Sequence, residues 1–213
     1  MRRSTSLWET LDQAKEEALG CTKCRLAEGR NSVVWMDGDP DSDLMFIGEG
    51  PGFHEDRQGV PFVGAAGKLL DKMLESIDLK RTDCTICNVI KCRPPNNRDP
   101  MPDEIDSCKP YLEAQIKFIA PRVIVPLGNF ATRFVLEQKV SISRVRGQRF
   151  EKFGAIVMPT YHPAAVLHGG GEDSPTARGL REDFESIRDL LAEAEAKVQA
   201  TDEPQEGTQQ ALF

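Results

Sequence analysis

Four short apolar runs, each followed by a stretch of helical periodicity, constrain the fold of this chain more than any other feature. The runs are residues 43–48, 84–90, 122–128 and 155–159. Apolar runs of this length are typical of buried strands in a parallel sheet, whose crossover connections are helices. The alternation predicts an α/β fold with three layers, α/β/α, around a central, mainly parallel four-stranded sheet.

Capping residues and apolar faces mark the predicted helices. Ser6 to Glu9 form a capping box before the first helix, and Gly20 follows its end. Residues 64–79 carry one apolar face, and another helix begins near Pro102. The last helix is expected from about residue 180 to residue 198.

The 213 residues have room for one substantial domain. We expect it to span residues 1–199, followed by a disordered polar tail at 200–213. No apolar run approaches the ~18–20 residues of a membrane span, and the first residues lack the apolar core of an export signal. These features predict a monomeric, cytoplasmic protein, not a membrane protein, whose cysteines bind metal or stay reduced.

The net charge of −7 is unevenly distributed. Residues 181–206 carry three basic and nine acidic side chains, a net charge of −6. Residues 91–149 carry eleven basic and six acidic side chains, a net charge of +5. The middle of the chain is therefore the part expected to present a basic face to nucleic acid, with an ordinary mixed surface as the alternative.

Four cysteines have the arrangement of a four-thiolate metal centre. Cys21 and Cys24 form a C-x2-C loop, and Cys92 and Cys108 follow far downstream with fifteen residues between them. A short loop that holds two ligands, joined by two more that the fold brings in, suits such a centre.

Cys84 and Cys87 form a second C-x2-C pair. A zinc site made of this pair and the first C-x2-C loop is an alternative, but it leaves Cys92 and Cys108 unexplained. Buried free thiols are the simpler interpretation of the second pair.

Three predicted strands bring polar or glycine-rich residues to one edge of the sheet. GEGPG at residues 48–52 follows the first strand, Asn88 ends the second and His162 follows the fourth. Ligands of open α/β sheets bind beyond the carboxyl ends of the strands. Taken singly, each of these residues also has a purely structural explanation, but their convergence predicts a site.

The segments GEGPGFHED, GVPFVGAAGKLLDKML, VIVPLGNFA and HPAAVL, with the asparagine just before KCRPPNNRDP, resemble family 4 uracil-DNA glycosylases. These are the iron–sulfur members of their superfamily, and the resemblance runs from about Cys21 to Leu190. It implies that uracil-containing DNA is the substrate. It also implies a [4Fe–4S] cluster on four ligands: Cys21, Cys24, Cys92 and Cys108.

The resemblance implies a pocket for a flipped uracil. Phe62 would stack on the base, and Asn88 would hydrogen-bond its Watson–Crick edge, where a fixed carboxamide suits uracil better than cytosine. Gly50 would let the backbone approach the base, and Asn97 would assist at the site.

The same resemblance implies the catalytic groups. His162 would donate to uracil O2 as negative charge builds on the leaving base. Glu49, with Glu55 or Asp56, would stabilise the cationic sugar and orient water. Which carboxylate does which is left open.

After His162, apolar Val166 and Leu167 lie in a segment rich in turn formers. In the superfamily this loop enters the minor groove, where apolar side chains act as wedges. An ordinary surface loop is the alternative.

The chain is thus predicted to be a monofunctional glycosylase that starts base excision repair, with no lysine nucleophile for strand cleavage. A related branch that traps DNA through a histidine near the third cysteine is rejected, because the only histidines are His54, His162 and His168. Two alternatives remain: a non-catalytic iron–sulfur module that binds damaged DNA, and a zinc-dependent hydrolase.

Residues Gln209–Phe213 match the Q-x-x-L-F pattern of peptides that dock on bacterial sliding clamps. Leu212 and Phe213 would be apolar anchors on a polar tether, which would raise the local concentration of enzyme at replicating DNA. A chance match is the alternative.

Overall fold

A six-stranded sheet forms the centre of the fold, in the order β1-β3-β2-β4-β6-β5. The computed structural model describes residues 7–171 and 173–202 of the chain. The four inner strands run parallel, whereas β1 and β5 pair antiparallel at the two edges. The strands are β1 Asp37–Gly38, β2 Leu44–Gly48, β3 Thr85–Asn88, β4 Val123–Pro126, β5 Phe150–Lys152 and β6 Ala155–Val157.

The four predicted parallel strands are present, but the prediction of four strands in all is wrong. The two additional strands, β1 and β5, have two and three residues. Strands this short carry too little alternation for a sequence pattern to show. β5 forms a hairpin with β6 through Phe153 and Gly154, both of which have positive φ.

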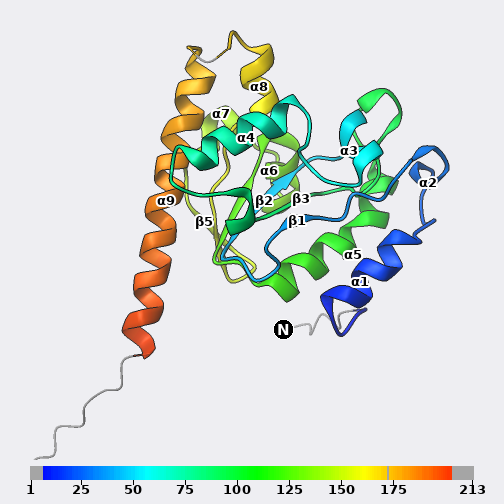
Figure 1. Ribbon diagram of the computed structural model, residues 1–213, viewed down its shortest axis with the longest axis horizontal. Helices are drawn as coiled ribbons and strands as arrows, with labels where there is room; N and C mark the ends of the chain where they lie inside the picture. Colours follow the sequence, from blue (N-terminus) through cyan, green and yellow to red (C-terminus); the bar gives the residue numbers. More distant parts are fainter. Residues whose placement is uncertain (1–6, 172, 203–213) are drawn as a thin grey trace, which may run out of the picture.

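Helices cover both faces of the sheet, which confirms the predicted three layers (Figure 1). One layer holds α1, α5 and α6, and the other holds α4, α8 and α9. No described helix is long and apolar enough to cross a membrane. The long and layer-forming helices are α1 Leu11–Leu19, α4 Ala65–Glu75, α5 Pro102–Ile119, α6 Gly128–Leu136, α8 Pro163–His168 and α9 Pro175–Asp202. The remaining helical segments are α2 Leu26–Gly29, α3 Phe53–Gln58 and α7 Ile142–Val145, with 3-10 turns η1 Arg81–Asp83 and η2 Pro95–Asn97.

Each face of the sheet has its own apolar core, because neighbouring residues of a strand point to opposite sides. In β2, Met45 and Ile47 belong to the core shared with α1 and α5, whereas Leu44 and Phe46 belong to the core shared with α4 and α9. Phe46 stacks on Phe184 of α9 with 5.6 Å between ring centroids. Burial on both faces explains why the strand reads as an unbroken apolar run.

The first helix begins later than predicted. Thr10 precedes α1, and its side-chain oxygen accepts a hydrogen bond from the backbone N–H of Gln13 at 3.2 Å. The predicted capping box at Ser6–Glu9 is therefore wrong, and Ser6 itself lies outside the described residues. Gly20 ends the helix as expected.

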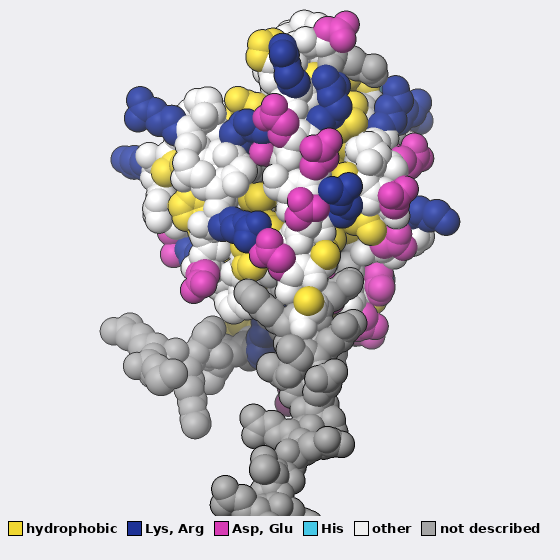
Figure 2. All heavy atoms as spheres, turned by 90° about the vertical axis from the view of Figure 1, so that its left-hand side faces the viewer, with side chains coloured by type: hydrophobic (Ala, Val, Ile, Leu, Met, Phe, Trp, Pro, Cys, Tyr) yellow, Lys and Arg dark blue, Asp and Glu magenta, His cyan; other side chains and the backbone are white. Residues whose placement is uncertain are grey.

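The last helix, α9, lies along the outside of the molecule, at the left of Figure 1. It begins five residues earlier than predicted, because the Ser174 hydroxyl accepts the N–H of Ala177 at 3.1 Å and caps it. Its exposed side is mixed in charge: Figure 2 shows Asp and Glu interspersed with Lys and Arg on this face. The helix continues to Asp202, beyond the predicted end near residue 198. The predicted clamp-binding segment Gln209–Phe213 lies outside the described residues.

Candidate active site

A cavity of about 510 Å³ opens at the carboxyl ends of the parallel strands. Seven of the residues predicted for the site contribute to its wall, although they come from five separate stretches of the chain. The predicted convergence of strand ends is thus present in the fold, and the cavity is open, not blocked. The lining residues are Glu49, Gly50, Pro51, Gly52, Glu55, Phe62, Ala66, Asn88, Ile90, Pro94, Asn97, Arg98, Pro100, His162, Ala164, Ala165 and His168.

Gly48 lets two cavity side chains, Asn88 and Phe62, come together, a role that was not among those predicted for the site. A Cβ at this position would lie 2.3 Å from Oδ1 of Asn88 and 2.7 Å from the ring of Phe62. Only glycine therefore allows these two side chains to meet over the end of β2. Gly50 is constrained in the same way, since its Cβ would lie 2.7 Å from Cγ1 of Ile90. The signal was present in the sequence as the first glycine of GEGPG.

Phe62 is held in a left-handed backbone conformation, with φ of 53°. The turn packs tightly on α4, because a Cβ at Gly67 would lie 1.7 Å from the Phe62 carbonyl oxygen. Arg81 of η1 donates to the carbonyl oxygens of Pro61 and Phe62, the latter at 3.1 Å. The ring of Phe62 stacks on His162 with 5.5 Å between centroids.

Arg81 is itself fixed by two carboxylates. Its guanidinium forms ion pairs with Asp37 and with Asp71, the second at 3.1 Å. Carbonyl groups that receive charge-assisted hydrogen bonds from a fixed guanidinium are held firmly. Arg81 therefore maintains a strained turn nineteen positions away, which no local sequence pattern indicates.

Asn88 ends β3 opposite Gly48 and is 2% exposed. Its backbone carbonyl accepts a hydrogen bond from Nζ of Lys91 at 2.6 Å, and Oε1 of Gln115 accepts a second from the same amine at 2.6 Å. Lys91 is buried, and burial lowers its pKa. This lysine fixes the strand end that carries Asn88, a role that no sequence pattern indicates.

His162 stands at the start of α8, where its tautomer is set by a backbone group. The N–H of Ala164 donates to Nδ1 of His162 at 3.1 Å. Because Nδ1 accepts, the ring proton of the neutral imidazole sits on Nε2. Burial lowers the pKa of His162 to about 4, against a smaller opposing effect from Glu55. At neutral pH the residue is a neutral donor.

The two carboxylates that line the cavity have different surroundings. Burial, with the nearby charge of Asp99, raises the pKa of Glu49 above its ordinary value. Oε1 of Glu55 accepts hydrogen bonds from the N–H groups of Val63 and Gly64, both at 2.9 Å. Glu55 therefore fixes the segment after Phe62, whereas Glu49 is the more available to a ligand.

Asp56, expected as a third carboxylate of the site, does not line the cavity. It is 1% exposed, and Oδ1 accepts the N–H groups of Asn31 at 2.9 Å and Ser32 at 3.3 Å. The other oxygen accepts the side-chain amide of Asn31. The expectation fails because consecutive residues of α3 point in different directions, so that only Glu55 of the pair faces the cavity.

Asn97 reaches the cavity from η2, where its φ is 52°. Its Oδ1 accepts from Nε of Arg93 at 2.7 Å. The adjacent Arg98 also lines the cavity and makes a two-pronged contact with Glu104 of α5, at 2.8 and 2.6 Å.

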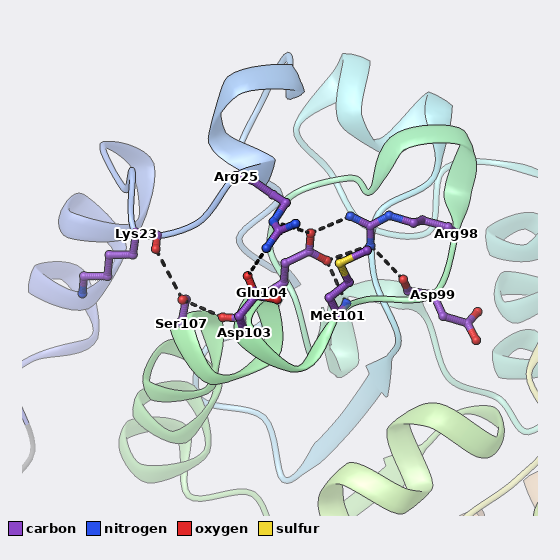
Figure 3. A network of polar contacts seen from close by, with 8 residues as sticks. All are labelled: Lys23, Arg25, Arg98, Asp99, Met101, Asp103, Glu104 and Ser107. Carbon is purple, nitrogen blue, oxygen red and sulfur yellow. Dashed lines mark hydrogen bonds and ion pairs between the residues drawn. The ribbon is translucent and has the colours of Figure 1, made fainter.

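Glu104 lies at the centre of the network in Figure 3 and is fully buried. The hydrogen bonds from Arg98 lower the pKa of Glu104, and their effect exceeds that of burial, which raises it. Arg25, just after the C-x2-C loop, approaches the same carboxylate and bonds Asp103 at 2.7 Å. The network joins the cysteine loop to one wall of the cavity.

The two apolar residues after His162 lie in different surroundings. Val166 is 1% exposed and belongs to the core beneath α4 and α9, so it is not placed as a wedge. Leu167 is 45% exposed. Because the segment forms α8 instead of a loop, adjacent side chains are rotated by about 100° around the helix axis, which separates the buried side from the exposed side.

The four predicted thiolate ligands, Cys21, Cys24, Cys92 and Cys108, line one small cavity between α1, α2 and α5. In the described part of the chain, no three His, Cys, Asp or Glu side chains are close enough to share one metal ion. A single zinc ion needs four sulfurs at about 2.3 Å, whereas a cluster gives each cysteine its own iron and needs a space between them. Thiols that surround a space fit a cluster better than a single ion.

N–H donors face the sulfurs of this cavity. Nη1 of Arg30 donates to Sγ of Cys92 at 3.5 Å, and the N–H of Lys91 donates to Sγ of Cys108 at 3.2 Å. Burial raises the pKa of Cys108 to about 12. The N–H donors from Arg30 and Lys91 favour the deprotonated sulfurs that metal binding requires.

Cys84 and Cys87 lie in the two different cores, on opposite faces of the sheet. Both are buried, and Sγ of Cys84 contacts the carbonyl oxygen of Arg81 at 3.5 Å. They cannot join one site, so the alternative zinc centre fails and the interpretation as buried thiols holds.

Comparison with known proteins agrees with this geometry. The model of the uracil DNA glycosylase superfamily matches residues 35–184. The chain is 46% identical to a type-4 uracil-DNA glycosylase of Sulfurisphaera tokodaii over 192 residues, 85% of each chain. It is 44% identical to that of Archaeoglobus fulgidus over 91% of this chain and 97% of the relative. For that of Thermotoga maritima, the identity is 42% over 86% of this chain and 95% of the relative.

The family model matches most of the chain, and the α/β sheet carries its cavity at the strand ends, so the chain belongs to the uracil DNA glycosylase superfamily. Within that superfamily it belongs with the type-4 uracil-DNA glycosylases, because all three of these relatives are of that type.

Proposed function

We propose that this protein removes uracil from DNA by hydrolysing the N-glycosidic bond, leaving an abasic site. The observation that carries the proposal is the meeting of Phe62, Asn88 and His162 at one cavity. Asn88 and Phe62 come together there because position 48 is a glycine, where any Cβ would collide with both. An aromatic ring, a carboxamide and a neutral imidazole are the groups that would stack on, read and polarise a flipped base.

Recognition falls to Asn88. Uracil presents an N3–H donor and an O4 acceptor, which one carboxamide matches with its oxygen and its amide. Cytosine presents the reverse pattern at these atoms. In the same orientation the carboxamide oxygen would face an acceptor and the carboxamide NH2 would face a donor. An unpaired buried polar group costs about 1–3 kcal/mol, which would make the discrimination strong. Lys91 supports it by holding the backbone of Asn88.

Bond cleavage divides between His162 and Glu49. The C1′–N1 bond breaks and its electron pair leaves with uracil, while Nε2–H of His162 donates to O2, where charge develops. Water forms the new C1′–O bond, and its proton passes to the carboxylate of Glu49. A neutral imidazole with a low pKa can donate a hydrogen bond without giving up its proton.

The cavity wall also supports a monofunctional enzyme. None of the described residues that line it is a lysine, and the nearby Lys91 is committed to Asn88 and Gln115. Without an amine to attack C1′, water is the nucleophile and the strand stays intact.

We further propose that Cys21, Cys24, Cys92 and Cys108 hold a [4Fe–4S] cluster. Four cysteine ligands close its coordination, so the cluster would supply structural cross-linking and not a reactive metal site. The N–H donors from Arg30 and Lys91 would stabilise its negative charge. Arg25, which follows the cysteine loop, forms an ion pair with Glu104 of α5. Glu104 in turn bonds Arg98 of the cavity wall.

A single gel assay tests the proposed function. A labelled oligonucleotide with one uracil is incubated with the protein and then either heated in alkali or left untreated. We expect cleavage only after alkali, because an abasic site is alkali-labile. An intact strand after alkali would refute the glycosylase, and cleavage without alkali would refute the monofunctional mechanism.

A further inference from the structure

An exposed aromatic ring beside two arginines lies next to residues that line the cavity. Phe53, the first residue of α3, is 46% exposed. The guanidinium carbon of Arg57 lies 5.5 Å from its ring centroid, and that of Arg93 lies 5.2 Å away. We call these three residues the Phe53 cluster.

The Phe53 cluster has no evident role in folding. Phe53 belongs to neither apolar core of the sheet. In the part of the chain that the structure describes, no carboxylate forms an ion pair with Arg57 or Arg93. The cluster therefore combines an apolar face with uncompensated positive charge.

The cluster lies next to residues that line the cavity. Gly52 and Glu55, which flank Phe53 along the chain, line the cavity, and so does Asn97. Asn97 accepts the hydrogen bond from Arg93, so one arginine of the cluster touches a cavity residue directly. A nucleotide in the cavity would therefore have a neighbour within reach of the ring.

We propose that the Phe53 cluster binds the nucleotide adjacent to the target on the same strand, with Phe53 stacked on its base and the arginines on its phosphates. Aromatic rings stack on any base, and arginines beside them neutralise the backbone. The inference rests on the proposed function, and it adds a second contact outside the uracil pocket.

A consequence is a preference for single-stranded substrate. Bases of a duplex are already stacked, so a new stacking surface gains least there. Base–aromatic stacking is worth about 1–3 kcal/mol by alanine substitution, which is roughly a 5- to 150-fold change in affinity. The cluster should therefore contribute more to binding of single strands.

The test compares Phe53→Ala with Phe153→Ala. Phe153 is the matched control, because it is also exposed, at 49%, and also carries a cation, Lys152, at 5.2 Å from its ring. It lies on the β5–β6 hairpin and does not line the cavity. Steady-state kinetics are measured on a single-stranded oligonucleotide with one uracil.

We expect Phe53→Ala to raise KM about tenfold with kcat within twofold, and Phe153→Ala to change neither. A second substrate has abasic residues on both sides of the uracil, so that no neighbouring base can stack. On it, Phe53→Ala should match the wild type, and Phe53→Trp should retain wild-type KM on the ordinary substrate.

Three results would overturn the proposal: an unchanged KM for Phe53→Ala, an equal loss on the substrate with abasic neighbours, or a loss confined to kcat. Failure of the proposed function is a different result, since the wild-type protein would then release no uracil from either substrate. Phe53 is exposed, so its replacement is not expected to unfold the protein.

Discussion

At the scale of single residues, the cavity owes its chemistry to side chains that have little freedom. Asn88 is almost fully buried and faces Phe62 across Gly48. His162 has its tautomer chosen by one backbone N–H. Pre-organised donors of this kind need no rearrangement at the moment of reaction.

Replacing Asn88 by Asp should reduce uracil excision strongly. The carboxylate keeps the shape of the side chain but faces uracil O4 without a donor, at a cost of roughly 1–3 kcal/mol or more. We expect kcat/KM to fall at least tenfold in the oligonucleotide assay. Asn96→Asp is the control, because Asn96 is exposed and does not line the cavity. Equal effects of the two changes would remove Asn88 from recognition.

His162 should remain neutral well below neutral pH. Its pKa is lowered to about 4 by burial. Between about pH 6.5 and pH 4 the unfolded chain binds a proton at this histidine that the folded chain does not, so the free energy of unfolding should fall as pH falls. NMR of the imidazole nitrogens measures the titration directly and should show the proton on Nε2 at pH 7. A midpoint near 6.5 would contradict the assignment.

At the scale of elements, short turns carry long-range constraints. η1 has three residues, yet its Arg81 holds the Phe62 turn, which lies before α4. The fixed guanidinium fork, not charge alone, matches the two carbonyl oxygens.

Replacing Arg81 by Gln should loosen the Phe62 turn. Two carbonyl oxygens lose a charged donor, and Asp37 and Asp71 lose their partner. We expect about 1–3 kcal/mol of lost stability and a lower kcat/KM, with partial recovery in Arg81→Lys. Arg122→Gln, which breaks a surface ion pair with Asp43, should cost no more than about 1 kcal/mol. Chemical denaturation of the variants would show whether this order holds.

At the scale of the whole molecule, the cysteine cavity ties the N-terminal helix to α5. Its four cysteines come from positions as far apart as Cys21 and Cys108. A covalent centre there would add cross-links to segments that one sheet core already packs together.

Replacing Cys92 by Ser should lower iron and sulfide content together with thermal stability, because the cluster would lose one of four ligands. Cys84→Ser is the matched control, since Cys84 is a buried thiol of the opposite core. It should retain full iron content. Metal analysis of both purified variants decides the ligand set: full iron in Cys92→Ser would show that the set is wrong.

Removing the residues after Glu206 tests the remaining sequence pattern. The truncated protein should excise uracil from short oligonucleotides as the full chain does, because the cavity lies far earlier in the sequence. It should no longer bind a purified bacterial sliding clamp. If the full-length chain shows no clamp binding, the prediction for Gln209–Phe213 fails.

The amino-acid sequence by itself determined the layers, the four parallel strands and the strand ends that carry the site. These follow from local patterns: apolar runs bury on both faces, and parallel strands end at one edge. The spacing of the cysteines left two possible sets of four, and the fold places Cys21, Cys24, Cys92 and Cys108 at one cavity.

Only the tertiary structure decided which neighbours face the cavity. Glu55 points into it and Asp56 away, and Leu167 is exposed whereas Val166 is buried. The two residues of each pair have similar chemistry, so the difference comes from the rotation of one residue along a short helix. The roles of Arg81 and Lys91 could not be predicted from the sequence either, because each donates to a backbone carbonyl that only folding brings within reach.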